Sequence, residues 1–107
     1  MLALALREAG AAGVAVRIVA TGAWHRPILA EYDPVLRSIA IDSRVVADLR
    51  AARGAAFAAR FVAFAIWHEL HHARFAVRDE RAAHAYAMAH TGLDAALFER
   101  AVRALRP

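Results

Sequence analysis

Apolar and polar residues alternate with a period of two in three short stretches, and this pattern predicts a small sheet near the start of the chain. The stretches cover residues 14–21, 25–32 and 37–42. Strict alternation over so few residues is typical of a strand with one buried face. The second and third stretches flank the turn signal Asp33-Pro34, so we expect them to form an antiparallel hairpin.

A helical period and well-placed capping residues predict helices before and after this sheet. Gly10 and Gly13 end the first helix, and Ser43 and Gly54 are the expected N-cap and stop of the second. Asp79 and Asp94 are candidate N-caps of later helices. The expected helices cover residues 2–9, 44–53, 55–73, 79–90 and 95–105. The predicted fold class is therefore α+β, a single domain over residues 1–107 with a small antiparallel three-stranded sheet packed against helices.

The helix expected over residues 55–73 is apolar on nearly all sides, which predicts that it is the central one. One stripe along it consists of Phe57, Phe61, Phe64, His68, His72 and Phe75, and the opposite side carries Val62, Ile66 and Leu70. The two histidines continue a stripe that must face the core or a cleft. Buried histidines need hydrogen bonds or a metal. The position of these two histidines on the stripe therefore predicts that each has a polar partner or a metal.

Composition and charge exclude several classes of site. The chain has no cysteine, so disulfides and thiolate metal ligands are excluded. The net charge of +4 is spread without a basic cluster, which does not favour a nucleic-acid partner. The apolar runs are shorter than the roughly 20 residues of a membrane span and too short for a signal peptide. We therefore expect a soluble, cytoplasmic protein.

The sequence HELHH at residues 68–72 fits the pattern His-Glu-x-x-His, which supplies two metal ligands and a base from one helical turn. His68 and His72 lie four residues apart, so their side chains are neighbours on a helix and can converge on one zinc ion. Glu69 lies beside this pair, close enough to hold a water molecule without being a ligand.

A zinc hydrolase needs a third protein ligand, and Glu80 heads the next helix. On a straight helix Glu80 would lie about 12 Å beyond His72 along the axis and could not reach the same ion. We therefore expect the chain to turn back between Arg74 and Arg78. Asp79, as an N-cap, is the local signal for this break.

HELHH followed by ERAAHAYA resembles the gluzincin metallopeptidases, most closely the minigluzincins and the ImmA/IrrE-type peptidase domains. That family has a downstream Glu-x-x-Ala-(Asp or Asn)-x-(Phe or Tyr)-Ala motif, which Glu80, Ala83, Tyr86 and Ala87 match. The motif match covers residues 67–87, and before it only the order of the elements is similar. The resemblance implies that His68, His72 and Glu80 bind Zn²⁺ and that Glu69 is the catalytic base.

His84 departs from the family pattern, because it stands where the family usually has Asp or Asn. It lies one turn after Glu80 on the same face. It could accept a hydrogen bond from a ligand imidazole, which keeps a catalytic site, either active or slow, and this is the alternative we favour. It could instead be a fourth metal ligand, which makes a structural site.

Further aromatic and histidine residues have weaker functional signals. Tyr86 is a candidate for transition-state stabilisation, although its spacing is also typical of a core aromatic. His71 is expected to face solvent or to contact a ligand residue, and His25 and His90 to lie at the surface. Core or sheet-covering positions are expected for Trp24, Tyr32 and Trp67.

The expected activity is zinc-dependent hydrolysis of a peptide or protein. An extended substrate is expected to add to an exposed edge strand, for which residues 37–42 are the candidate. ImmA/IrrE-type proteins often work with a repressor partner, so the resemblance makes a repressor-type protein one candidate substrate. Two other classes stay open, namely a metal-binding regulatory module without turnover and a helical interaction domain with structural histidines.

Overall fold

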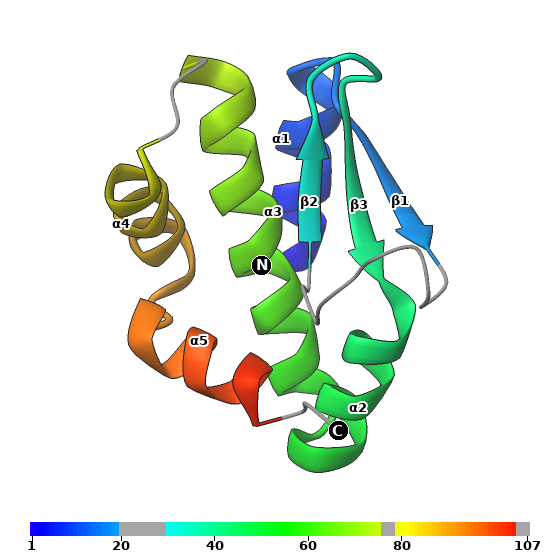
Figure 1. Ribbon diagram of the computed structural model, residues 1–107, viewed down its shortest axis with the longest axis vertical. Helices are drawn as coiled ribbons and strands as arrows, with labels where there is room; N and C mark the ends of the chain where they lie inside the picture. Colours follow the sequence, from blue (N-terminus) through cyan, green and yellow to red (C-terminus); the bar gives the residue numbers. More distant parts are fainter. Residues whose placement is uncertain (20–29, 76–78, 105–107) are drawn as a thin grey trace.

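A small sheet and five helices make up the part of the chain that the computed structural model describes, residues 1–19, 30–75 and 79–104 (Figure 1). This arrangement confirms the predicted α+β class and the predicted order of one helix, three strands and four helices. In chain order the elements are α1 (Leu2–Ala11), β1 (Ala15–Val19), β2 (Ala30–Asp33), β3 (Ser38–Asp42), α2 (Ser43–Arg53), α3 (Ala55–Phe75), α4 (Glu80–Thr91) and α5 (Ala95–Arg103).

The sheet is mixed, so the prediction of an antiparallel sheet is wrong. Its strand order is β1-β3-β2, with β1 parallel to β3 and β2 antiparallel to β3. The β2–β3 hairpin was predicted correctly, because the two strands are close in sequence and share one turn. Alternation of side chains indicates a strand but carries no information about its neighbour. The place of β1 on the far side of β3 could therefore not be predicted from the same pattern.

The hairpin turn is built by the Asp33 side chain. Its Oδ1 accepts hydrogen bonds from the backbone N–H of Val35 at 2.9 Å and of Leu36 at 3.2 Å. Arg37 then takes a left-handed backbone conformation with φ of 48° and closes the turn before β3. The turn predicted from Asp33-Pro34 is therefore present. The Asp33 side chain accepts hydrogen bonds from the backbone N–H groups of the turn, as aspartate commonly does in turns.

The strand at residues 37–42 is not an edge strand, contrary to the prediction. β3 pairs on both sides, and its Ile39 and Ile41 are fully buried. Within the described sheet, the edge strand that packs beside α3 is β2. Any strand-like ligand at this side of the sheet would therefore have to pair with β2.

The long helix α3 is the centre of the fold and packs against α1, α2, α4 and β2 (Figure 1). Phe61 and Phe64 of the predicted stripe are fully buried, as are Ile66 and Leu70 on the other side. The ends of the stripe were predicted wrongly, since Phe57 is 36% exposed and Phe75 54% exposed. A helix of 21 residues is about 30 Å long, and its buried residues run from Ala58 to His71, which leaves its two ends less covered.

Side-chain caps set the starts of three helices. Asp42, rather than the predicted Ser43, caps α2 by accepting a hydrogen bond from the Arg44 N–H at 2.9 Å. The predicted caps Asp79 of α4 and Asp94 of α5 are confirmed, and Gly54 ends α2 as expected. Asp42 takes the cap because it is the last residue of β3 with extended backbone, whereas Ser43 is already helical.

Replacing Asp94 with alanine should lower the free energy of unfolding by about 1 kcal/mol, the usual contribution of a helix N-cap. Asp94 Oδ1 accepts hydrogen bonds from Ala96 N–H at 2.8 Å and Leu97 N–H at 3.1 Å, and alanine removes both. Urea denaturation measures the change. Asp94→Asn keeps the acceptor and serves as the control, and equal loss in both variants would contradict a capping role.

Several predictions fall on residues 20–29 and 105–107, outside the described residues. They concern Trp24, His25, the start of the second strand and the end of the last helix at Leu105. Among the described residues, no helix is long and apolar enough to cross a membrane.

Candidate metal centre

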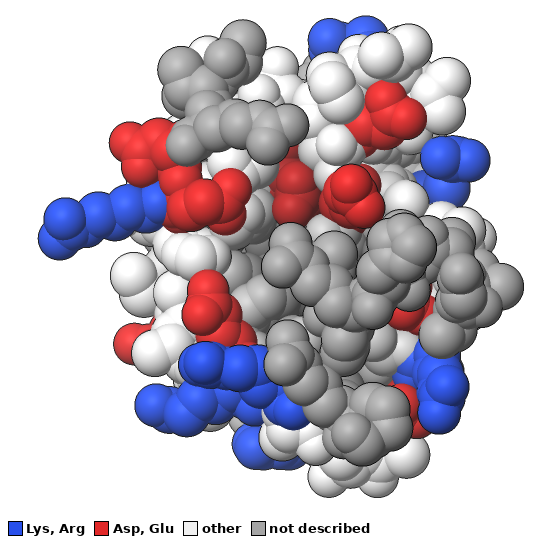
Figure 2. Space-filling view, in the orientation of Figure 1, with Lys and Arg blue, Asp and Glu red and all other residues white. Residues whose placement is uncertain are grey.

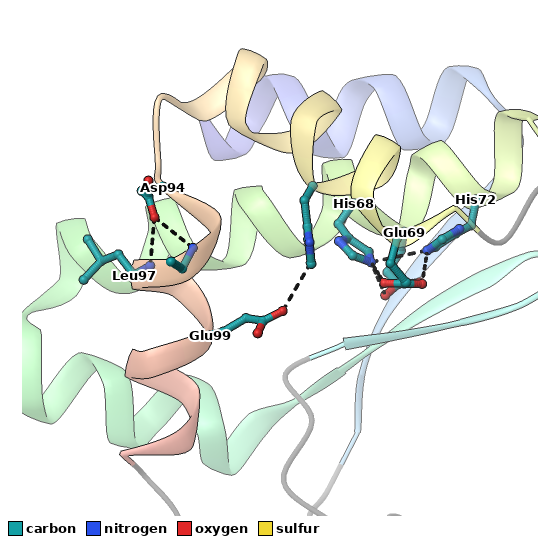
Figure 3. A network of polar contacts seen from close by, with 9 residues as sticks. His68, Glu69, His72, Asp94, Leu97 and Glu99 are labelled. Carbon is teal, nitrogen blue, oxygen red and sulfur yellow. Dashed lines mark hydrogen bonds and ion pairs between the residues drawn. The ribbon is translucent and has the colours of Figure 1, made fainter.

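His68 and His72 project from the same side of α3, as their spacing predicts, and point toward the same place (Figure 3). Their Nε2 atoms are 3.3 Å apart. Both side chains are largely covered, with 12% and 13% of their surfaces exposed. The two imidazoles therefore bring their Nε2 atoms together at a place where most of each ring is covered.

Glu80 joins the two histidines from the neighbouring helix. It is the first residue of α4, directly after the cap Asp79, whose side chain accepts a hydrogen bond from the Ala82 N–H at 3.0 Å. The Glu80 Oε2 is 2.9 Å from His68 Nε2, and its Oε1 is 2.9 Å from His72 Nε2. The expectation that the chain turns back after α3 and presents Glu80 to the histidines is thus confirmed.

The spacing of these donors fits a zinc ion. Two ligands that bind one zinc at 2.0–2.1 Å with tetrahedral angles lie about 3.3–3.4 Å apart. The two Nε2 atoms have this separation, and the carboxylate contacts of 2.9 Å are slightly shorter. Two imidazoles and one carboxylate are also a donor set that zinc prefers in catalytic sites.

His84 lies close to this group, one turn after Glu80 on α4. Its ring centroid is 4.7 Å from that of His68. One of its ring nitrogens also belongs to a second set of donors, with His68 and Glu80, whose ligand atoms all lie within 4.8 Å of one another. Since the contacts among His68, His72 and Glu80 are only 2.9–3.3 Å long, we take those three as the primary set.

Glu69 lies beside the histidine pair and is mostly covered. Its Oε1 is 3.9 Å from His68 Nε2, and 15% of its side-chain surface is exposed. The backbone N–H of Tyr32 donates a hydrogen bond to the Glu69 carboxylate. Because this N–H belongs to the edge strand β2, the contact joins the sheet edge directly to the candidate base.

The electrostatics of the site follow from burial in an environment rich in carboxylates. Burial, together with the negative charges of Glu80 and Glu31, raises the pKa of Glu69 to about 8, and the Tyr32 hydrogen bond opposes the shift. Burial also lowers the pKa of His68 to about 4, although the Glu80 carboxylate opposes this shift. A divalent cation favours the ionised carboxylate and the neutral imidazole, which are the forms that bind metals.

Tyr86 points to a different set of neighbours. Its ring packs edge-on against Trp67 and Phe75, and its hydroxyl accepts a hydrogen bond from Arg74 Nη1 at 2.6 Å. Arg74 in turn contacts Glu8 of α1 at 2.8 Å. Within the described part of the chain, these contacts tie α1, α3 and α4 together and include no ligand candidate, which agrees with the reading of Tyr86 as a packing aromatic.

The remaining histidines differ in their surroundings. His71 does not face solvent, contrary to the first alternative predicted for it, because it is only 8% exposed and packs between Phe75 and Tyr86. The reason is that α4 covers the side of α3 on which His71 lies. His90 is exposed as predicted, and its ring stacks on the buried Trp67 with centroids 3.7 Å apart.

Three groups near the site were not predicted. They are Glu99 of α5, Glu31 of β2 and the backbone N–H of Tyr32. Acidic side chains gather on the face between α4 and the sheet, while arginines lie mainly around its rim (Figure 2). No known motif places these three groups at a fixed sequence distance from the histidines. Their nearness to the site is therefore visible only in the folded structure.

Comparisons with protein-family models, with curated proteins and with solved structures found no match for this chain.

Proposed function

We propose that this chain is a zinc-dependent peptidase in which His68, His72 and Glu80 hold the metal and Glu69 is the general base. The observation that carries the proposal is the convergence of four donor atoms from two helices. The two imidazole nitrogens are 3.3 Å apart, and each lies 2.9 Å from one oxygen of Glu80, with Glu69 3.9 Å from His68. A zinc ion held there would lower the pKa of a water molecule toward about 7 and polarise a peptide carbonyl.

Glu69 supplies the proton transfers of this reaction. It is covered, close to the ligand pair and held by the Tyr32 N–H, so its free carboxylate oxygen can accept a proton from the attacking water. The same carboxyl group then gives the proton to the leaving amine. Positioning of this base by the backbone of β2 limits its motion, and a fixed geometry is what general-base catalysis requires.

The edge strand β2 is the proposed binding site for the substrate backbone. β2 is an edge strand of the described sheet beside α3, and the Tyr32 backbone is within hydrogen-bonding reach of Glu69. An extended peptide along β2 would bring its carbonyl groups past the histidine pair. This replaces β3 as the docking strand while keeping strand addition as the mode of binding. The substrate class is a peptide or an extended segment of a protein.

A second candidate function is a metal-binding module without turnover, which acts through a protein partner. It is favoured by the nearness of His84, whose ring nitrogen lies within 4.8 Å of ligand atoms of His68 and Glu80. A fourth protein ligand would occupy the position that a hydrolase leaves to water, and closed four-ligand sites are typical of structural zinc. Bound zinc without cleavage of any peptide would favour this candidate.

Metal analysis of the purified protein tests the proposal. The wild-type chain should bind about one zinc, and Glu80→Ala should weaken binding by more than about 100-fold, because even outer partners of zinc ligands contribute 10- to 100-fold. Competition with a chromophoric chelator measures the affinity.

The matched control is Asp48→Ala, which removes a half-exposed carboxylate of α2 that lies 4.0 Å from Arg44. It should bind zinc like the wild type. A wild-type chain that binds no zinc, or a Glu80→Ala variant with unchanged affinity, would refute the proposed ligand set.

A further inference from the structure

Glu31 lies in the middle of β2, on the strand beside the candidate site. β2 pairs with β3 on one side only, where Glu31 is aligned with Ala40. No strand of the described sheet lies on the other side of β2. A peptide that adds to this open side, as in the proposed function, would therefore become the second neighbour of Glu31.

The carboxylate of Glu31 lies on the outer face of the sheet. Successive side chains of a strand point to opposite faces, and the next residue, Tyr32, is aligned with the fully buried Ile39. Glu31 is exposed, and within the described part of the chain its side chain forms no ion pair. Arg17 of β1 is aligned with Ala40 from the far side of β3, so two strand spacings, about 9–10 Å, separate its backbone from that of Glu31.

Glu31 is also close to the candidate base. It directly precedes Tyr32, whose backbone N–H donates a hydrogen bond to Glu69, and its negative charge acts on Glu69. The carbonyl group that is attacked must lie near Glu69. A substrate residue aligned with Glu31 would therefore lie within about two residues of the cleaved bond, since a strand rises about 3.3 Å per residue.

We propose that Glu31 determines specificity, by favouring peptide segments that place an arginine or lysine beside it on the added strand. This inference rests on the proposed function. Directly opposite residues of neighbouring strands have Cβ atoms about 4.5–5.5 Å apart, where opposite charges stabilise the pairing and like charges destabilise it. The neighbour on β3, Ala40, has only a methyl group and leaves the carboxylate charge uncompensated.

The distribution of charge around the site favours the same choice. Acidic side chains gather on the face between α4 and the sheet, and arginines lie mainly around its rim (Figure 2). The charges of Glu80 and Glu69 are offset when a divalent cation is bound between them, whereas that of Glu31 remains. The chain as a whole carries +4, but exposed charges farther away than about 8–10 Å are largely screened, so the neighbouring carboxylate dominates.

Cleavage of charge-scanned peptides by the zinc-loaded protein tests the proposal. The probes are a peptide that the wild type cleaves and its variants with Arg, Ala or Glu at each position near the cleaved bond. At one position the wild type should prefer Arg over Glu by about 10-fold in kcat/KM, because attraction and repulsion each contribute up to about 5-fold. Glu31→Lys should reverse this preference, and Glu31→Gln should abolish it without a change in side-chain size.

The matched control is Asp48→Lys, which changes the net charge of the chain as Glu31→Lys does but lies on α2. It should keep the wild-type preference. Salt gives a further readout, since the preference of the wild type should shrink when the ionic strength rises from about 0.05 M to about 0.5 M. An effect of Glu31 on folding alone would neither reverse a charge preference nor depend on salt in this way.

Two results would overturn the inference while the proposed function stands. One is a wild-type protein that cleaves the Arg and Glu peptides equally well at every position near the bond. The other is a preference for Arg that stays unchanged in both Glu31→Lys and Glu31→Gln. A wild-type chain that binds zinc but cleaves no peptide, or binds no zinc, would instead refute the proposed function and this inference with it.

Discussion

Replacing Glu69 with glutamine should abolish peptide hydrolysis while the fold and the bound zinc remain. Glutamine has the same shape, but its amide cannot accept a proton from water. Loss of a positioned general base costs about 10²- to 10⁴-fold in rate. Glu69 lies 3.9 Å from His68, farther than the ligand candidates are from one another, so its loss should leave zinc affinity nearly unchanged.

Cleavage of a peptide library, scored by mass spectrometry, measures this effect, and metal analysis of the same sample checks the zinc content. The matched control is Glu8→Gln, which changes a glutamate of α1 that pairs with Arg74 outside the site. It should cleave like the wild type. Undiminished cleavage by Glu69→Gln would remove Glu69 from the mechanism.

Replacing His68 with alanine should have the largest effect on metal binding. His68 makes two of the three close contacts, since its Nε2 lies 3.3 Å from His72 Nε2 and 2.9 Å from Glu80 Oε2. It also belongs to the alternative set with His84. The variant therefore loses a donor in either arrangement. Zinc retained after dialysis should fall from about one per chain to near zero, a loss of more than about 100-fold in affinity.

The control for His68→Ala is His90→Ala, which removes an exposed histidine of α4 that stacks on Trp67. Both proteins are compared by metal analysis and by circular dichroism, so that unfolding is recognised as such. Unchanged zinc content in folded His68→Ala would show that the histidine pair of α3 is not the metal site.

Local signals in the sequence predicted the elements and half of the site well. Asp79 and Asp94 act as caps because capping depends on the next three residues only. His68 and His72 converge because their relation is set by the helical repeat. The prediction that Glu80 meets them depended on a reversal of the chain, which the cap at Asp79 indicated.

Relations between distant segments could not be predicted. The parallel pairing of β1 with β3 places β3 in the middle of the sheet, and no local pattern encodes that order. His71 is buried because α4 covers its side of α3, which an angle around a single helix does not reveal. Glu99 lies 15 residues after His84 and reaches it only because Phe98 docks α5 on α3.

The burial of α3 on several sides divides the candidate site into a rigid and an adaptable part. Backbone amides near Phe64 and Leu70, which are fully covered, should exchange with solvent deuterium only when the whole chain unfolds. His68, Glu69 and His72 are carried by this most protected segment. Glu80, 65% exposed at the first turn of α4, and Glu99, half exposed on α5, belong to segments that open at lower cost. The proposed metal ligands therefore lie on segments of unequal protection, and amides at the start of α4 should exchange with deuterium before those around His68 and His72.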